Sequence, residues 1–195
     1  MGIEIFGLKF GKQGGALFTP LGSAFEEAVK RGRVFAVASQ AGVTSQAGLS
    51  ATTPVLTLPN PAGSGVRGKL WYAAATFTVA FATAGAVWLA VGTNPVAAAV
   101  TGTLTTAHRN LKLGGQAPGI VPMLAATLPA APVGISLLGA GLTGAITTIP
   151  VIQVLERWFN GAVLIEPGTN VSLQTGVASG ASGMFCEYIW EEEDI

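Results

Sequence analysis

The sequence predicts an all-β fold, an antiparallel jelly-roll-like sandwich with one short N-terminal helix and a long proline- and glycine-rich loop. Apolar residues alternate with small or polar residues in segments such as "TFTVAFAT" (76–83), and a two-residue period is typical of a strand with one buried face. Turn-forming residues separate many short apolar runs. Half of the 195 residues are hydrophobic, so one domain can bury a substantial core. We expect about eight strands at this spacing of turns.

The first 22 residues are interpreted as an arm, and residues 23–195 as a single sandwich domain. The arm is rich in glycine and therefore too flexible to build a core alone. Its large apolar residues would nevertheless not stay free in water, and residues 3–10 can form a strand. We expect the arm to order on contact, by adding a strand to a neighbouring sheet edge or by lying along a larger assembly. The alternative is a strand of its own sandwich. The arm residues expected to bind a partner are Ile3, Ile5, Phe6, Leu8, Phe10, Leu17 and Phe18.

The one predicted helix begins at Ser23, because Ser23 and Glu26 have the spacing of a capping box. It continues to about Arg31 and ends at Gly32, a residue type that favours the position after a helix. Phe25 and Val29 are four residues apart and share a face, so they should dock the helix onto the sheet.

Strand-like segments follow the helix. They are "RVFAVASQ", "TPVLTLPNP", "GKLWYAAATFTVAFAT" and "AVWLAVGTN", then "IPVIQVLERWF", "AVLIEPGTNVSLQT" and "GMFCEYIWEEE". Asn160-Gly161 predicts a two-residue hairpin, and Pro167-Gly168 predicts another turn. The proline-rich interval 114–132 is predicted to be a long loop or insertion. The four tryptophans fall inside predicted strands and are interpreted as core or sheet-surface residues.

Charged residues are few and unevenly placed. They make up 10% of the chain, against about 25% in typical soluble domains, which favours a protein that covers much of its surface in an assembly. Seven basic residues and no acidic residue lie between Glu27 and Glu156. The C-terminal part is acidic, so we expect Glu191, Glu192 and Glu193 to meet a basic patch, on the same subunit or on a neighbour. A solvated acidic tail is the alternative.

The residues predict no enzyme, cofactor or metal. Gly139, Gly141 and Gly144 have the G-x-G-x-x-G spacing, and a strand before them is plausible, but Pro150 leaves too little room for the helix that would hold a pyrophosphate. Cys186 and His108 are the single residues of their kinds, which leaves no cluster of ligands or nucleophiles within one chain. Paired carboxylates are not expected, because all the acids lie near the two ends. The basic runs are too short to predict nucleic-acid binding.

Membrane insertion is the competing interpretation, since 70–107 and 113–155 carry no Asp, Glu, Lys or Arg and each exceeds the roughly 20 residues of a spanning helix. The first stretch has a period of two and the second contains five prolines, neither of which suits a helix in lipid. We therefore expect soluble β-structure without a membrane partner.

The run "TPVLTLPNPAGSG" with the apolar strand after it, and the ending "GAVLIEPGTNVSLQTG…GMFCEYIWEEE", resemble small β-sandwich structural proteins of tailed bacteriophages. Such chains are rich in Ala, Gly and Thr, poor in charge, and often end on an aromatic strand with W-E or W-E-E. The similarity covers residues 53–92 and 161–193.

The resemblance implies a capsid decoration (cement) protein on the surface of the virion, made in the host cytoplasm. Its partners would be its own copies, as a homotrimer, and the major capsid protein or another virion protein. We expect the uncharged stretch 114–150 to contribute buried intersubunit surface, because a monomer would expose it as an apolar patch. A receptor- or glycan-binding module of a phage fibre or tail is the alternative, and a membrane-associated protein is the third.

Overall fold

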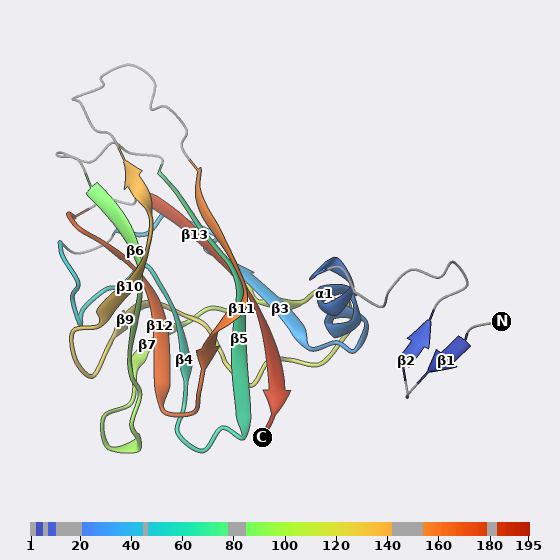
Figure 1. Cartoon of the computed structure of the whole chain (residues 1–195). Coiled ribbons are helices and arrows are strands. Elements are labelled where there is room, and N and C mark those ends of the chain that lie inside the picture. Colours follow the sequence, from blue (N-terminus) through green and yellow to red (C-terminus); the bar gives the residue numbers. More distant parts are fainter. Residues whose placement is uncertain are drawn as a thin grey trace.

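The computed structural model describes residues 3–5, 8–10, 21–44, 47–77, 85–141, 154–178 and 183–195. Two antiparallel sheets face each other, one short α-helix lies beside them, and a separate two-stranded hairpin lies beyond the helix (Figure 1). The prediction of an all-β sandwich with one short helix is confirmed.

The five-stranded sheet has the order β11-β5-β13-β3-β8. Its strands are β11 (Val154–Ile165), β5 (Val66–Phe77), β13 (Met184–Asp194), β3 (Val34–Ala38) and β8 (Arg109–Asn110). The six-stranded sheet has the order β10-β6-β12-β4-β9-β7. Its strands are β10 (Val133–Gly141), β6 (Gly85–Thr93), β12 (Thr169–Thr175), β4 (Leu56–Asn60), β9 (Met123–Thr127) and β7 (Thr101–Leu104), and a 3₁₀ turn, η1 (Val96–Ala98), follows β6. The described residues contain thirteen strands, more than the predicted eight, because several are only two to five residues long.

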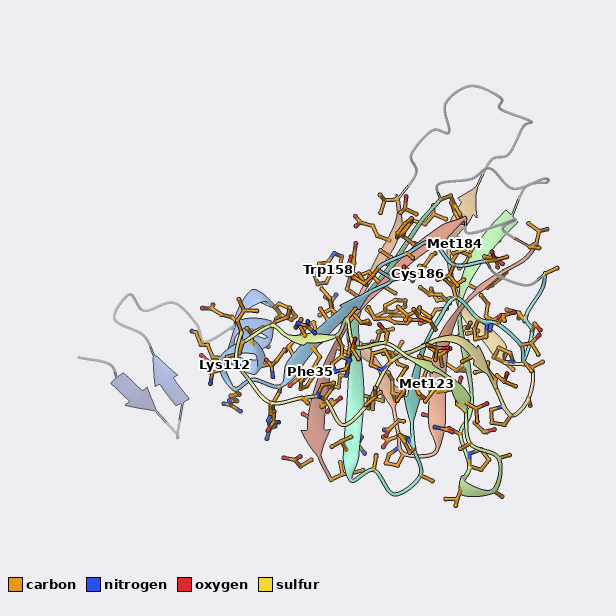
Figure 2. All side chains as sticks on the ribbon, turned by 180° about the vertical axis from the view of Figure 1, so that it is seen from behind. Phe35, Lys112, Met123, Trp158, Met184 and Cys186 are labelled. Atoms are coloured by element: carbon orange, nitrogen blue, oxygen red, sulfur yellow. The ribbon has the colours of Figure 1, made fainter. Side chains whose placement is uncertain are left out.

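The core lies between the two sheets. On β13 the residues at every second position, Met184, Cys186, Tyr188 and Trp190, are buried in it, which is the period expected of a strand with one inward face. Phe35 of β3 packs its ring 5.6 Å from that of Trp190. Figure 2 labels Phe35, Met184 and Cys186 on this sheet.

The N-terminal segment contains two short strands, so the prediction of one strand over 3–10 is wrong. β1 (Ile3–Ile5) pairs antiparallel with β2 (Leu8–Phe10), with Ile5 opposite Leu8. The chain therefore reverses between them, and their two-stranded sheet is separate from both sheets of the sandwich.

Helix α1 (Leu21–Lys30) begins two residues before the predicted Ser23. Ser23 is thus within the first turn and not at the cap, because the backbone of the two residues before it is already helical. The predicted end is confirmed: Gly32 has φ +73°, and the Arg33 amide donates to the Ala28 carbonyl at 3.1 Å, as in a glycine-terminated helix.

The predicted docking of the helix is confirmed for Phe25. Its ring lies edge-on to Trp71 of β5 at 5.1 Å and to Trp158 of β11 at 6.5 Å. Trp71 is an extra residue in its strand, since Ile189 pairs with Tyr72 and Trp190 with Leu70. The bulge turns Trp71 toward α1.

Asn160-Gly161 forms no hairpin, and that prediction is wrong. Both residues have positive φ, +52° and +76°, as a hairpin turn of this sequence would require. β11 nevertheless continues past them on the same partner strand, with Trp158 opposite Tyr72 and Val163 opposite Leu70. The two residues therefore lie in a wide bulge of β11. The turn at Pro167-Gly168 is confirmed, with φ +83° at the glycine.

The interval 114–132 is not one continuous loop, because β9 lies within it and pairs with β4 and β7. Ile120 is also fully buried in the core. The strand before the G-x-G-x-x-G spacing is confirmed as β10, while residues 142–153, where a helix would follow, lie outside the described residues. A Cβ added at Gly139 would lie 2.8 Å from Leu155 Cδ2, so this glycine lets β10 pack closely against β11.

Within the described part of the chain, no helix has the length and hydropathy needed to cross a membrane.

The wide bulge of β11 gives a test of local backbone strain. Gly161→Ala should lower the free energy of unfolding by about 1–2 kcal/mol, because a side chain disfavours the left-handed conformation. Gly176→Ala is the matched control, since a Cβ there meets its nearest atoms at 3.6 Å, and it should change stability little. Urea denaturation of the two variants measures the difference, and equal stabilities would contradict the assigned φ at Gly161.

Candidate interaction surface

The charged residues of the sandwich strands lie in one sheet. None of the six strands β4, β6, β7, β9, β10 and β12 contains an Asp, Glu, Lys or Arg. The strands of the five-stranded sheet contain Arg67, Lys69, Arg109, Glu156, Arg157, Glu187, Glu191, Glu192, Glu193 and Asp194. One sheet can therefore face water, while the other is an uncharged layer whose exposed parts suit contact with another protein surface.

The acidic C-terminus contacts basic residues of its own chain. The predicted contact with a basic patch therefore occurs within one subunit. Lys69 of β5 pairs with Glu193 of β13, and Arg33 Nη2 lies 3.8 Å from Asp194 Oδ2. These contacts join neighbouring segments at the lower end of the five-stranded sheet in Figure 1. The acids form the end of a paired strand and not a solvated tail.

Glu192 is the most buried of these acids, at 8% exposure. One oxygen accepts from the Gly119 amide at 2.7 Å, and the other accepts from the Ile120 amide and from Trp190 Nε1, both at 2.9 Å. Glu191 accepts a hydrogen bond from Trp71 Nε1 at 3.2 Å. Glu191, Glu192 and Glu193 thus have partners within one chain, and contact with another protein through them stays a prediction.

The predicted arm residues are only partly described. Ile3 and Ile5 lie in β1, and Leu8 and Phe10 lie in β2. The others, Phe6, Leu17 and Phe18, lie outside the described residues.

An apolar groove, which we call the β10/β11 groove, lies where the edge strands of the two sheets approach each other. Its volume is about 620 Å³ and none of its lining residues is charged. Val133 and Ile135 of β10 line one side, with 66% and 49% exposure, and Ala162, Val163 and Leu164 of β11 line the other. Beyond the groove the two strands meet, since Arg157 Nη1 donates to Ser136 Oγ at 2.8 Å.

One polar atom in the groove has no partner. Asn170 is only 1% exposed, and its Nδ2 donates to the Thr93 carbonyl at 2.7 Å, but its Oδ1 accepts no hydrogen bond. The amide packs closely against Gly92, because a Cβ there would lie 3.1 Å from Nδ2. A buried acceptor without a donor costs about 1–3 kcal/mol, so this oxygen is a local cost to stability at the floor of the groove.

A second surface lies on the outer face of the five-stranded sheet. Trp158 is 53% exposed and its ring lies 4.8 Å from that of Tyr72, whose hydroxyl donates to Glu156 Oε2 at 2.6 Å. Ala74 is opposite Glu156 on one side and opposite Glu187 on the other, so the two carboxylate residues flank one small residue. A cavity of about 260 Å³ lies there.

Sequence reasoning missed this pair of acids, because 31 positions separate the two residues (187 minus 156). Only strand pairing brings them onto β5 from opposite sides. Burial raises the pKa of Glu187, and the nearby charge of Glu156 raises it further. Burial is also the main cause that raises the pKa of Tyr72, with the hydrogen bond to Glu156 as the second.

Among the residues with described positions, no group of three or more His, Cys, Asp or Glu side chains is placed to hold a metal ion. No protein-family model matches the chain, and no curated protein or solved structure resembles it closely enough to count as a match.

Glu192 gives a first prediction for this end of the sheet. Glu192→Leu should lower the free energy of unfolding by about 2–4 kcal/mol, because it leaves three N–H donors without an acceptor. The control is Glu193→Gln, which removes a partly exposed ion pair and should change stability by at most about 1 kcal/mol. Urea denaturation of both variants tests this, and a Glu192→Leu protein as stable as the control would show that these hydrogen bonds stabilise little.

Glu187 gives a prediction about pH. Its pKa is raised in the folded protein, so between its unfolded and folded pKa values the folded state binds more protons, and stability falls as pH rises through that window. Glu187→Gln should therefore raise the melting temperature at pH 7 and have a smaller effect below pH 4. Thermal melts of the variant and the parent across pH measure this, and a variant less stable than the parent at pH 7 would reject the interpretation.

Proposed function

We propose that this chain is a structural virion protein, a capsid decoration (cement) protein of a tailed bacteriophage that acts as a homotrimer. Its partners are its own copies and the major capsid protein or another virion protein. The observation that carries the proposal is the uncharged six-stranded sheet with an exposed apolar edge at β10.

The exposed residues of β10 support a protein contact. Val133, Ile135 and Leu137 all expose 45% or more of their surface. They belong to β10, which pairs with β6 alone among the described strands. Contiguous apolar surface of this kind marks interaction sites in soluble proteins. The charged residues of the opposite sheet leave that side suited to water, which gives the molecule one side for assembly and one for solvent.

The expected intersubunit stretch, 114–150, agrees with this arrangement over its described part. Residues 114–141 include β9 and β10 and line part of the β10/β11 groove. Residues 142–150 lie outside the described residues.

A glycan-binding module of a phage fibre or tail is the second candidate. The observation that favours it is the exposed ring of Trp158 beside Tyr72 and Glu156, because sugars stack on aromatic faces and hydrogen-bond to polar neighbours. Glycan binding that is lost in Trp158→Ala but kept in Leu113→Ala, which changes another exposed apolar residue, would favour this candidate over decoration.

The decoration proposal predicts assembly in solution. Sedimentation equilibrium at micromolar concentration should give the mass of three chains of 19.7 kDa, because burying the apolar edge removes it from water. The purified protein should also co-sediment with phage heads and appear on their surface by electron microscopy. A stable monomer that does not bind heads would reject the proposal.

A further inference from the structure

We infer that the β10/β11 groove of one copy binds the hairpin β1–β2 of a second copy. This contact rests on the proposed self-assembly, and it names the two surfaces that form it. Among the described strands, neither β1 nor β2 pairs with a strand of the sandwich.

The lining of the groove suits an extended segment that carries apolar side chains. Its lining contains no charged residue, and Val133, Ile135 and Leu164 remain exposed along it. Its buried Asn170 Oδ1 accepts no hydrogen bond. An incoming segment with apolar side chains can cover these apolar walls and remove them from water.

The hairpin has the complementary pattern. Ile3 is opposite Phe10 and Ile5 is opposite Leu8, and residues two apart in a strand share a face. The register therefore places apolar residues opposite apolar residues at both of these positions. Glu4 and Lys9 are opposite each other, so the only two charges in the sequence of residues 3–10 offset each other.

The positions of the two surfaces favour a neighbour as the recipient. Helix α1 packs on Trp71 and Trp158 of the five-stranded sheet, and Figure 1 shows the hairpin beyond α1, on the side of the molecule away from β10. A contact between two different surfaces is heterologous, and when it is repeated by rotation it closes a ring such as a trimer.

The test is a mixing experiment with two variants, each of which lacks one half of the contact. Deletion of residues 2–10 removes the hairpin and keeps the groove. Ile135→Asp places a charge in the groove and keeps the hairpin. Leu113→Asp is the control, because Leu113 is 86% exposed and is not among the groove residues.

Each variant alone should sediment as a monomer, whereas the full chain and Leu113→Asp should assemble equally. An equimolar mixture of the two variants should form a 1:1 heterodimer, because one supplies a hairpin and the other an intact groove. Circular dichroism checks that each variant is folded, and Leu164→Asp on the opposite wall replaces Ile135→Asp if the latter is not.

A mixture that stays monomeric overturns the inference, and so does assembly of either variant to the mass of the full chain. If a variant assembles to the mass of the full chain, self-assembly does not need this contact, and the proposed function stands without it. If the full chain is itself monomeric and binds no heads, the proposed function fails as well.

Discussion

The carboxylate of Glu192 joins the centre of the five-stranded sheet to the segment that closes one end of the sandwich. It accepts hydrogen bonds from the Gly119 and Ile120 amides and from Trp190, so a buried charge has three donors. Ile120 is thereby held in the core beside Gly68, where a Cβ would lie only 2.8 Å from Ile120 Cδ1. The Glu192 carboxylate, Gly68 and the Ile120 side chain together determine how the two sheets pack at this end of the core.

The same end contains a second buried polar group, Asn60, whose amide nitrogen and oxygen both form hydrogen bonds. The Asn60 amide nitrogen donates to the carbonyls of Val66 and Ile165, and its oxygen accepts from Ser64 Oγ at 2.6 Å. Asn170 follows Thr169, the residue that pairs with Asn60, and is equally buried, but its oxygen accepts no hydrogen bond. Thr53, Thr57 and Thr76 each also contain a buried hydroxyl oxygen without a hydrogen-bond partner, so complete pairing is a property of Asn60 and not of every buried polar group.

Local sequence signals predicted the elements that depend on neighbouring residues. The end of α1 at Gly32 and the docking of Phe25 each follow from residues within a few positions. Asn160-Gly161 shows the limit of such signals. Its backbone has the left-handed conformation that the sequence favours, but tertiary pairing keeps both flanks on β5 and makes a bulge where a hairpin was expected.

Features that depend on distant strands could not be predicted in this way. Glu156 and Glu187 become neighbours only through their common partner, Ala74. β9 was missed because "MLAAT" has little strand character by itself, and it forms by pairing with β4 and β7. The groove has the same origin, since its walls come from β10 and β11 and its buried amide comes from β12.

Strand irregularities shape both walls of the groove. On β11, Ala162 belongs to the wide bulge, and on β10 the pairing with β6 shifts around Ile135 and again around Leu138. Bulges interrupt the regular row of main-chain groups that would make an edge strand a template for open-ended pairing. The two edges therefore resist unselective strand addition but still expose apolar side chains. Such an edge favours a short segment of matching shape over a long regular strand, and a three-residue strand such as β1 or β2 meets that requirement.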